Sequence, residues 1–248
     1  MLYIQKKSAP GEMVRKVSTI KSSSAWKSIA AGDTKAIRNA FDSLPKDEIR
    51  KNLLEEQHYL CAYCMRRIED NGRKTSIEHW YPLSQDKEKA LDYKNMLAVC
   101  DGGKNWNGLG KKILCCDAYK SDETELSVSP LNKTQMDKIC YDISGFIKTE
   151  PYDSSVDDDL NVKLHLNGLW KDGKFVADTS TGIVKARRDA YLQYKKFIKK
   201  LDNAGQCTSG NVQKKINEIE RMEHRIEYAG VLLFFLKKKH RSLVARGL

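Results

Sequence analysis

The sequence lacks a long hydrophobic run. Its longest apolar stretch, Val231–Leu236, has six residues, whereas a helix that crosses a bilayer needs about 20. The first residues also lack the apolar segment of a signal peptide. No internal repeat is visible. With 40% hydrophobic and 31% charged residues, the chain has the composition of a folded globular protein, and we expect it to be cytoplasmic.

Acidic residues are scarce in the last quarter of the chain. Residues 185–248 hold 16 Lys and Arg against 6 Asp and Glu, and this region accounts for nearly all of the net charge of +11. The first 184 residues are balanced to within one charge. Such a basic region favours contact with nucleic acid or with an acidic partner surface, although solvated helices alone would show the same composition.

Short apolar runs separated by turn residues predict an α+β fold. A strand-like arm is expected at residues 2–7, and the turn residues Asn71-Gly72 between two β-rich runs predict a hairpin. A helix is expected to open near Cys115. Three short helices are expected between the arm and the hairpin, at residues 22–31, 33–44 and 45–57, with Ser24 and Asp33 as N-caps and Pro45 at the third start.

The second half of the chain is expected to be mainly helical. Apolar residues at three- and four-residue steps predict a long helical hairpin with its loop at residues 205–211. An acidic stretch at residues 150–159 is the best candidate for a linker. The expected units are an N-terminal arm with helices at 1–57, a core at 58–149, the acidic linker at 150–159 and a basic helical region at 160–248.

Cysteine is concentrated in one region, which favours a metal site over disulfides in a cytoplasmic protein. Cys61 and Cys64 have the spacing at which two thiolates reach one zinc ion. Cys100, with either Cys115 or Cys116, would complete a tetrahedral site. A site with four cysteine ligands is closed to substrate and therefore structural. Buried free thiols are the alternative.

Residues with oxygen and imidazole groups lie between and beside these cysteines. Glu78 and Asp117 carry carboxylates suited to Mg²⁺ or Mn²⁺, and His79 has an imidazole whose ordinary pKa suits a general base. Pro82 cannot join a strand ladder, so the strand is expected to end near His79. Asn95 is able to donate to or accept from an imidazole. A strand end with a hydrogen-bonded surface histidine is the alternative.

The order of these residues resembles that of the zinc-containing HNH nucleases. The shared pattern is CxxC, then acid-His-x-x-Pro, then Asn five residues before a cysteine, then Cys-acid-x-x-Lys, over about Cys61 to Asp122. The resemblance implies a ββα-metal core with structural Zn²⁺ and catalytic Mg²⁺ or Mn²⁺. It also implies an endonuclease that hydrolyses the phosphodiester bonds of nucleic acid.

The resemblance gives each matching residue a role. His79 would be the general base that activates water, and Glu78 and Asp117 would bind the catalytic metal. Lys120 would lie near the scissile phosphate. Asn95 would either bind the metal or orient His79, and the sequence does not distinguish these two roles.

Two positions depart from the family pattern. Asp117 stands where the family has His or Asn, and an insertion separates Cys100 from the last cysteine pair. The frame Cys116-Asp117-x-x-Lys120 favours Cys116 as the fourth zinc ligand, with Cys115 as the alternative.

Outside this core the chain resembles, more weakly, the PtuB-like HNH proteins of the Septu and retron anti-phage systems. The likeness rests on the N-terminal arm, the helical segment before CAYC, and the segments LHLNG and VKARRDAY. It implies an effector controlled by a PtuA-like ATPase of the SMC/ABC type, with a retron reverse transcriptase and its RNA/DNA product as further partners. A zinc module without catalysis, which binds nucleic acid or that ATPase, is the alternative.

Overall fold

The computed structural model describes all residues except 31 and 121–123. Its helices are α1 (Gly11–Ser22), α2 (Ser24–Ser28), α3 (Thr34–Asp42), α4 (Lys46–Glu56), α5 (Lys87–Ala90), α6 (Lys133–Met136), α7 (Ser154–Asp158), α8 (Ile183–Asn203), α9 (Ser209–Arg221) and α10 (Ala229–Val244). Its strands are β1 (Thr75–His79), β2 (Met96–Cys100), β3 (Ile139–Tyr141), β4 (Ile147–Thr149), β5 (Leu169–Lys171) and β6 (Lys174–Ala177). Short helical turns are η1 (Tyr93–Asn95), η2 (Cys116–Ala118) and η3 (Asp159–Lys163).

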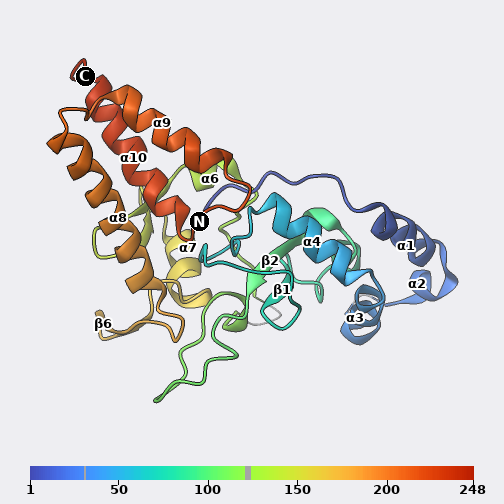
Figure 1. The fold of residues 1–248 in the computed structure, drawn as a ribbon. Coiled ribbons are helices and arrows are strands. Elements are labelled where there is room, and N and C mark those ends of the chain that lie inside the picture. The colour runs from blue at the N-terminus through green and yellow to red at the C-terminus, as the bar shows by residue number, and fades with distance from the viewer. Residues whose placement is uncertain (31, 121–123) are drawn as a thin grey trace.

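The described chain is an α+β protein, as the sequence predicted. Its strands form antiparallel pairs, β1 with β2, β3 with β4, and β5 with β6. Figure 1 shows α1–α3 at one end and α8–α10 packed together at the other, with β1 and β2 between them. In the part of the chain that the structure describes, no helix is long and apolar enough to cross a membrane.

The N-terminal segment differs from prediction in three ways. Residues 2–7 form no strand; Ile4 instead donates one backbone hydrogen bond to the Pro130 carbonyl, at 2.9 Å. The α1 helix was not expected, because its apolar residues are few; Met13 is buried, whereas Val14 is exposed. The cap of α3 is confirmed, since the Asp33 carboxylate accepts from the Ala36 N–H at 3.0 Å. The cap of α2 is Ser23 and not Ser24.

The predicted hairpin at Asn71-Gly72 is wrong, because β1 pairs with β2 and not with the segment before the turn. That earlier segment, residues 60–67, closes on itself, and we term it the knuckle. The Cys61 N–H donates to the Arg66 carbonyl at 2.9 Å, and the Met65 N–H donates to the Cys61 carbonyl at 3.0 Å. These bonds occupy the backbone groups that a strand ladder would need. A single bridge pair, Leu60 with Arg67, remains.

All five residues of β2 are buried, and α4 lies against it. Gln57, the residue after α4, fixes this contact: its side chain donates to the Ala98 carbonyl at 2.7 Å and accepts from the Ala98 N–H at 2.8 Å. A buried side chain that satisfies both groups of one residue acts as a substitute strand partner. The end of α4, the knuckle and β2 are thereby joined into one unit.

The C-terminal region contains three helices, so the predicted two-helix hairpin is incomplete. The periodic apolar positions fall into two groups. The buried ones are Val184, Ile198, Val212, Ile216, Ile219 and Leu233, and the half-buried ones are Tyr191, Tyr194, Leu201 and Ile226. The chain breaks between α9 and α10 because the segment turns toward the knuckle, where the Arg225 N–H donates to the His58 carbonyl at 3.2 Å. Tyr228 then opens α10 with a positive φ of 56°.

The acidic stretch at residues 150–159 is not an irregular loop. Asp153 caps α7, and Asp159 is fully buried. The Asp159 carboxylate accepts from the Val128 N–H at 2.6 Å and pairs with Lys163 at 2.7 Å. This segment is therefore packed in place, while the division of the chain into four units stays a prediction.

Candidate functional site

Four cysteines meet at one point in the core. The sulfur atoms of Cys61, Cys64, Cys100 and Cys116 all lie within 4.8 Å of one another, and all four residues are buried. The knuckle supplies the first two, the end of β2 supplies the third and η2 supplies the fourth. Three segments distant in sequence therefore converge on this cluster.

The donor set fits a zinc ion. Tetrahedral Zn–S bonds of about 2.3 Å place neighbouring sulfurs roughly 3.8 Å apart, and the Sγ atoms of Cys64 and Cys100 are separated by 3.7 Å. Burial raises the pKa of the Cys61 thiol, but hydrogen bonds from the neighbouring thiols outweigh it and hold that pKa well below its ordinary value. The pKa values of the Cys64, Cys100 and Cys116 thiols are raised instead, because these thiols share hydrogen bonds and burial with Cys61. One thiolate is therefore favoured in the cluster itself, and a bound cation would favour the ionisation of all four, since the thiolate is the form that binds metal.

Cys115 lies beside the cluster and outside it. Its thiol faces the Gly102 carbonyl at 3.7 Å and the Thr181 hydroxyl at 3.5 Å. Cys116 has a positive φ of 57° and donates its N–H to the Leu164 carbonyl at 2.9 Å. The two adjacent side chains thus have different surroundings, and of these two cysteines it is Cys116 that joins the other three. The helix expected from Cys115 onward is reduced, in the described part, to the short turn η2.

Two carboxylates and an ammonium group form a second cluster next to the cysteines. Lys120 pairs with Glu78 at 2.7 Å, and the Tyr63 hydroxyl donates to the same Glu78 oxygen at 3.3 Å. Burial is the main cause, and the neighbouring Asp117 carboxylate the second, of a Glu78 pKa raised well above its ordinary value, with Lys120 opposing both. Glu78 is buried and Asp117 is half-buried, and two neighbouring carboxylates are a donor set for a hard divalent cation.

His79 follows Glu78 in β1 and has different neighbours. Its Nε2 lies 3.0 Å from the Ala90 carbonyl, and its ring packs edge-on against Phe41 with centroids 4.4 Å apart. Burial lowers the pKa of His79 to about 4, so the ring is neutral near pH 7. Within the described residues no hydrogen bond joins His79 to Glu78 or Asp117. The strand also includes His79, which pairs with Met96.

Among the described residues, no hydrogen bond joins the Asn95 side chain to His79 or to a carboxylate. Its amide donates to the carbonyls of Tyr81 at 2.9 Å and Lys89 at 3.1 Å, and it accepts from the Tyr81 N–H at 2.8 Å. These bonds fix both ends of the segment between β1 and η1. Because that segment carries the Ala90 carbonyl, Asn95 is linked to His79 through the backbone.

Three contributors were missed from the sequence: Gln57, Tyr63 and the Ala90 carbonyl. Tyr63 had a signal, since it lies between Cys61 and Cys64 and its hydroxyl reaches Glu78. The Ala90 carbonyl had none, because any residue type presents one.

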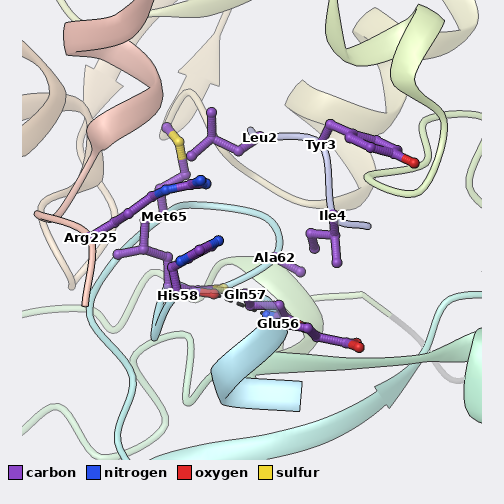
Figure 2. Close-up of a pocket in the computed structure, with 11 residues that line it drawn as sticks. Leu2, Tyr3, Ile4, Glu56, Gln57, His58, Ala62, Met65 and Arg225 are labelled. Carbon is purple, nitrogen blue, oxygen red and sulfur yellow. Dashed lines mark hydrogen bonds between the residues drawn. The ribbon is translucent and has the colours of Figure 1, made fainter. Parts of the chain in front are cut away.

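His58 was the one other histidine close in sequence to the cysteines. Its Nδ1 lies 3.0 Å from the Met222 carbonyl, and it lines a small cavity of about 20 Å³ together with Arg225 and the N-terminal arm (Figure 2). A cavity of this size holds about one water molecule. The His58 ring is thus engaged with the segment between α9 and α10, and the four thiols complete the metal set without it.

No family model matches the chain. The chain is 32% identical over 92 residues to a candidate HNH endonuclease of retron Ec83 from Escherichia coli. The match covers 34% of this chain and 35% of the relative, so only about a third of the relative's length is represented. Within that extent, the similarity supports a relationship to HNH nucleases.

Proposed function

We propose that the protein is a metal-dependent HNH endonuclease that hydrolyses phosphodiester bonds of nucleic acid. The observation that carries the proposal is the placement of buried Glu78 beside Asp117, with His79 next in the strand and the four-cysteine cluster adjacent. Strand β1, strand β2 and the segment that starts at Cys116 would be the ββα-metal core. The retron relative is described as an endonuclease of this class, which supports the same reading.

Glu78 and Asp117 would hold Mg²⁺ or Mn²⁺, which when bound would stabilise negative charge on the phosphate. The Ala90 carbonyl can only accept, so Nε2 of a neutral His79 donates to it and Nδ1 keeps its lone pair. His79 would take a proton from the attacking water at Nδ1. Asn95 would act as a positioning residue by holding the segment that presents the carbonyl.

Lys120 and the cysteines would support this chemistry. The Lys120 ammonium group lies 2.7 Å from Glu78, where it would help neutralise a bound phosphate. Zn²⁺ bound by Cys61, Cys64, Cys100 and Cys116 would join the knuckle, β2 and η2. That junction would hold Asp117 close to Glu78, because Asp117 directly follows the fourth cysteine.

The partner assignment is also part of the proposal. The retron relative supports a role in defence. Control by a PtuA-like SMC/ABC-type ATPase, and association with a retron reverse transcriptase and its RNA/DNA product, are proposed from the sequence resemblance alone. The basic region at residues 160–248 would contact such a partner or nucleic acid. A pull-down from cells that carry the neighbouring genes, followed by sequencing of cleaved nucleic acid, would identify the partner and the substrate.

The test of activity compares the wild type with His79→Ala on DNA and RNA in Mg²⁺ or Mn²⁺. His224→Ala is the control, because His224 is exposed and stacks on Tyr59. Cleavage is expected to be lost in the first variant and kept in the second, with equal zinc content and folding. Wild-type rates in His79→Ala would refute the proposed base.

The second candidate is a zinc module without catalysis. It is favoured by the ion pair between Glu78 and Lys120 and by the burial of His79, which is only 6% exposed. Retained nucleic-acid or ATPase binding, without cleavage under any combination of metal and partner, would support this candidate over the nuclease.

A further inference from the structure

The insertion between Cys100 and Cys115 carries a tip that nothing in the proposed chemistry uses. Figure 1 shows this segment, in green, projecting away from the helices and strands. Leu109 is 100% exposed and lies between Gly108 and Gly110. Single exposed apolar residues are ordinary on a protein surface. Leu109 differs from most of them because it lies in a run of exposed residues, 107–112, that leaves it accessible to a binding partner.

The base of the insertion is held firmly. The Cys115 N–H donates to the Gly102 carbonyl at 3.0 Å, and the Asn105 side chain donates to the Arg73 carbonyl at 3.0 Å. Ser180 binds the Ile113 backbone on both sides, with its N–H donating to the carbonyl at 2.9 Å and its hydroxyl accepting from the N–H at 2.8 Å. A Cβ on Gly102 would lie 2.1 Å from the Cys115 carbonyl oxygen, so this close approach requires glycine.

The tip is stiffened from within. The Trp106 ring packs onto Gly108, where a Cβ would lie 2.3 Å from the ring. The Lys112 ammonium group donates to the Lys104 carbonyl across the tip at 2.7 Å. Residues 104–112, which we term the tip loop, therefore present Leu109 on a braced support and not on a free strand of chain.

The charged residues of the tip loop are all basic. Between Asp101 and Asp117 the sequence contains Lys104, Lys111 and Lys112 and no acidic residue. Lys104 and Lys111 are exposed and make no ion pair with any residue that the structure describes. A single exposed leucine flanked by lysines covers far less area than the roughly 800 Å² per partner of a stable protein interface. One apolar side chain is enough, however, to act as a wedge between stacked bases.

We propose that the tip loop is a wedge for duplex DNA. Leu109 enters a base step from the minor groove, while Lys104 and Lys111 bind the phosphates on either side. The inference rests on the proposed nuclease function and adds the substrate class. The two stems of the loop lead back to Cys100 and Cys116 of the metal cluster, and Asp117 follows the second stem. The tip loop is therefore joined directly to the candidate site.

The test measures binding of the full-length, zinc-loaded protein to duplex DNA that carries 2-aminopurine, in Ca²⁺ without Mg²⁺ so that the DNA stays intact. Wild type is expected to raise the 2-aminopurine fluorescence, because unstacking relieves its quenching. Leu109→Ala is expected to abolish that rise and to weaken binding roughly tenfold. Val176→Ala is the matched control, since Val176 is an exposed apolar residue on β6, 54% exposed, and is expected to change neither signal.

A second experiment tests the lysines of the tip loop. It compares the double variant Lys104→Ala/Lys111→Ala with the double variant Lys171→Ala/Lys174→Ala on the exposed β5–β6 hairpin. The first pair is expected to lower the slope of log affinity against log salt by about two, and the second to leave it unchanged. Equal effects of the two pairs would overturn the phosphate contacts.

Three further results would overturn the wedge. The first is wild-type fluorescence and affinity in Leu109→Ala. The second is that Leu109→Ala loses as much affinity for single-stranded DNA and duplex RNA as for duplex DNA. The third is that Leu109→Ala loses affinity for a protein partner and keeps its affinity for DNA. Binding and unstacking without cleavage in Mg²⁺ or Mn²⁺ would refute the nuclease proposal and leave the wedge standing. Cleavage of duplex DNA that is unaffected by Leu109→Ala would refute the wedge and leave the nuclease proposal standing.

Discussion

The two adjacent cysteines allow a sharp test of the metal site, because they differ in position and not in chemistry. Cys116 lies in the four-thiol cluster, whereas Cys115 faces Gly102 and Thr181. Both are buried. We therefore expect Cys116→Ser to damage metal binding and Cys115→Ser to leave it intact.

The size of the effect follows from the number of ligands. Structural zinc sites contribute about 10–16 kcal/mol of apparent binding free energy. If the four thiolates share this free energy equally, the loss of one thiolate costs roughly 2.5–4 kcal/mol of binding free energy. The zinc affinity would then be lower by about two to three orders of magnitude. Cys115→Ser replaces a buried thiol by a hydroxyl that keeps Gly102 and Thr181 as partners, so we expect a loss of stability of about 1 kcal/mol.

The assay is competition of the purified proteins with a coloured zinc chelator, alongside metal analysis of the proteins as isolated. Urea unfolding with and without chelator measures how much stability depends on the metal. Equal zinc affinity in the two variants, or a larger loss in Cys115→Ser, would refute the assignment of the fourth ligand.

Three further predictions concern His79 and Asn95 at the candidate site and Asp159 in the acidic stretch. The His79 pKa is lowered from 6.5 to about 4, so the folded state binds fewer protons, and about 3 kcal/mol of stability present above pH 6.5 is lost as the pH falls toward 4. Urea unfolding at several pH values should show this slope in wild type and not in His79→Gln; an equal slope would contradict it. Asn95→Ala removes three hydrogen bonds, and we expect roughly 2–3 kcal/mol lower stability and slower cleavage with unchanged zinc content; unaltered cleavage would rule out a positioning role. Asp159→Ala leaves the buried Val128 N–H unpaired and should cost about 2–4 kcal/mol in thermal or urea unfolding, whereas a change below about 0.5 kcal/mol would show that this bond is dispensable.

Much of the site was predictable because its residues carry distinctive chemistry at short spacing. The CxxC pair, Cys100 and the last cysteine pair indicated a metal site before the fold was known. The α+β class and the periodic apolar positions of α8 and α9 followed from local pattern. The choice of Cys116 followed from the motif frame, and the cluster contains that cysteine.

The rest depended on contacts that a local pattern does not encode. Asn71-Gly72 has the chemistry of a hairpin turn, but the knuckle uses the backbone groups of its first arm. The break between α9 and α10 arises where Arg225 binds His58, two residues far apart in the chain. The orientation of His79 depends on the Ala90 carbonyl, and the route from Asn95 to His79 passes through that same segment.

The measurement that tests the central claim most directly is metal-dependent cleavage by Glu78→Gln. The change keeps the shape of the side chain and removes the charge that would hold the catalytic cation. The control is Glu69→Gln, at a half-exposed ion pair with Lys74 away from the site. We predict that Glu78→Gln retains the zinc content of the wild type and cleaves no nucleic acid in Mg²⁺ or Mn²⁺, while Glu69→Gln cleaves normally. Cleavage by Glu78→Gln at the wild-type rate would contradict the account.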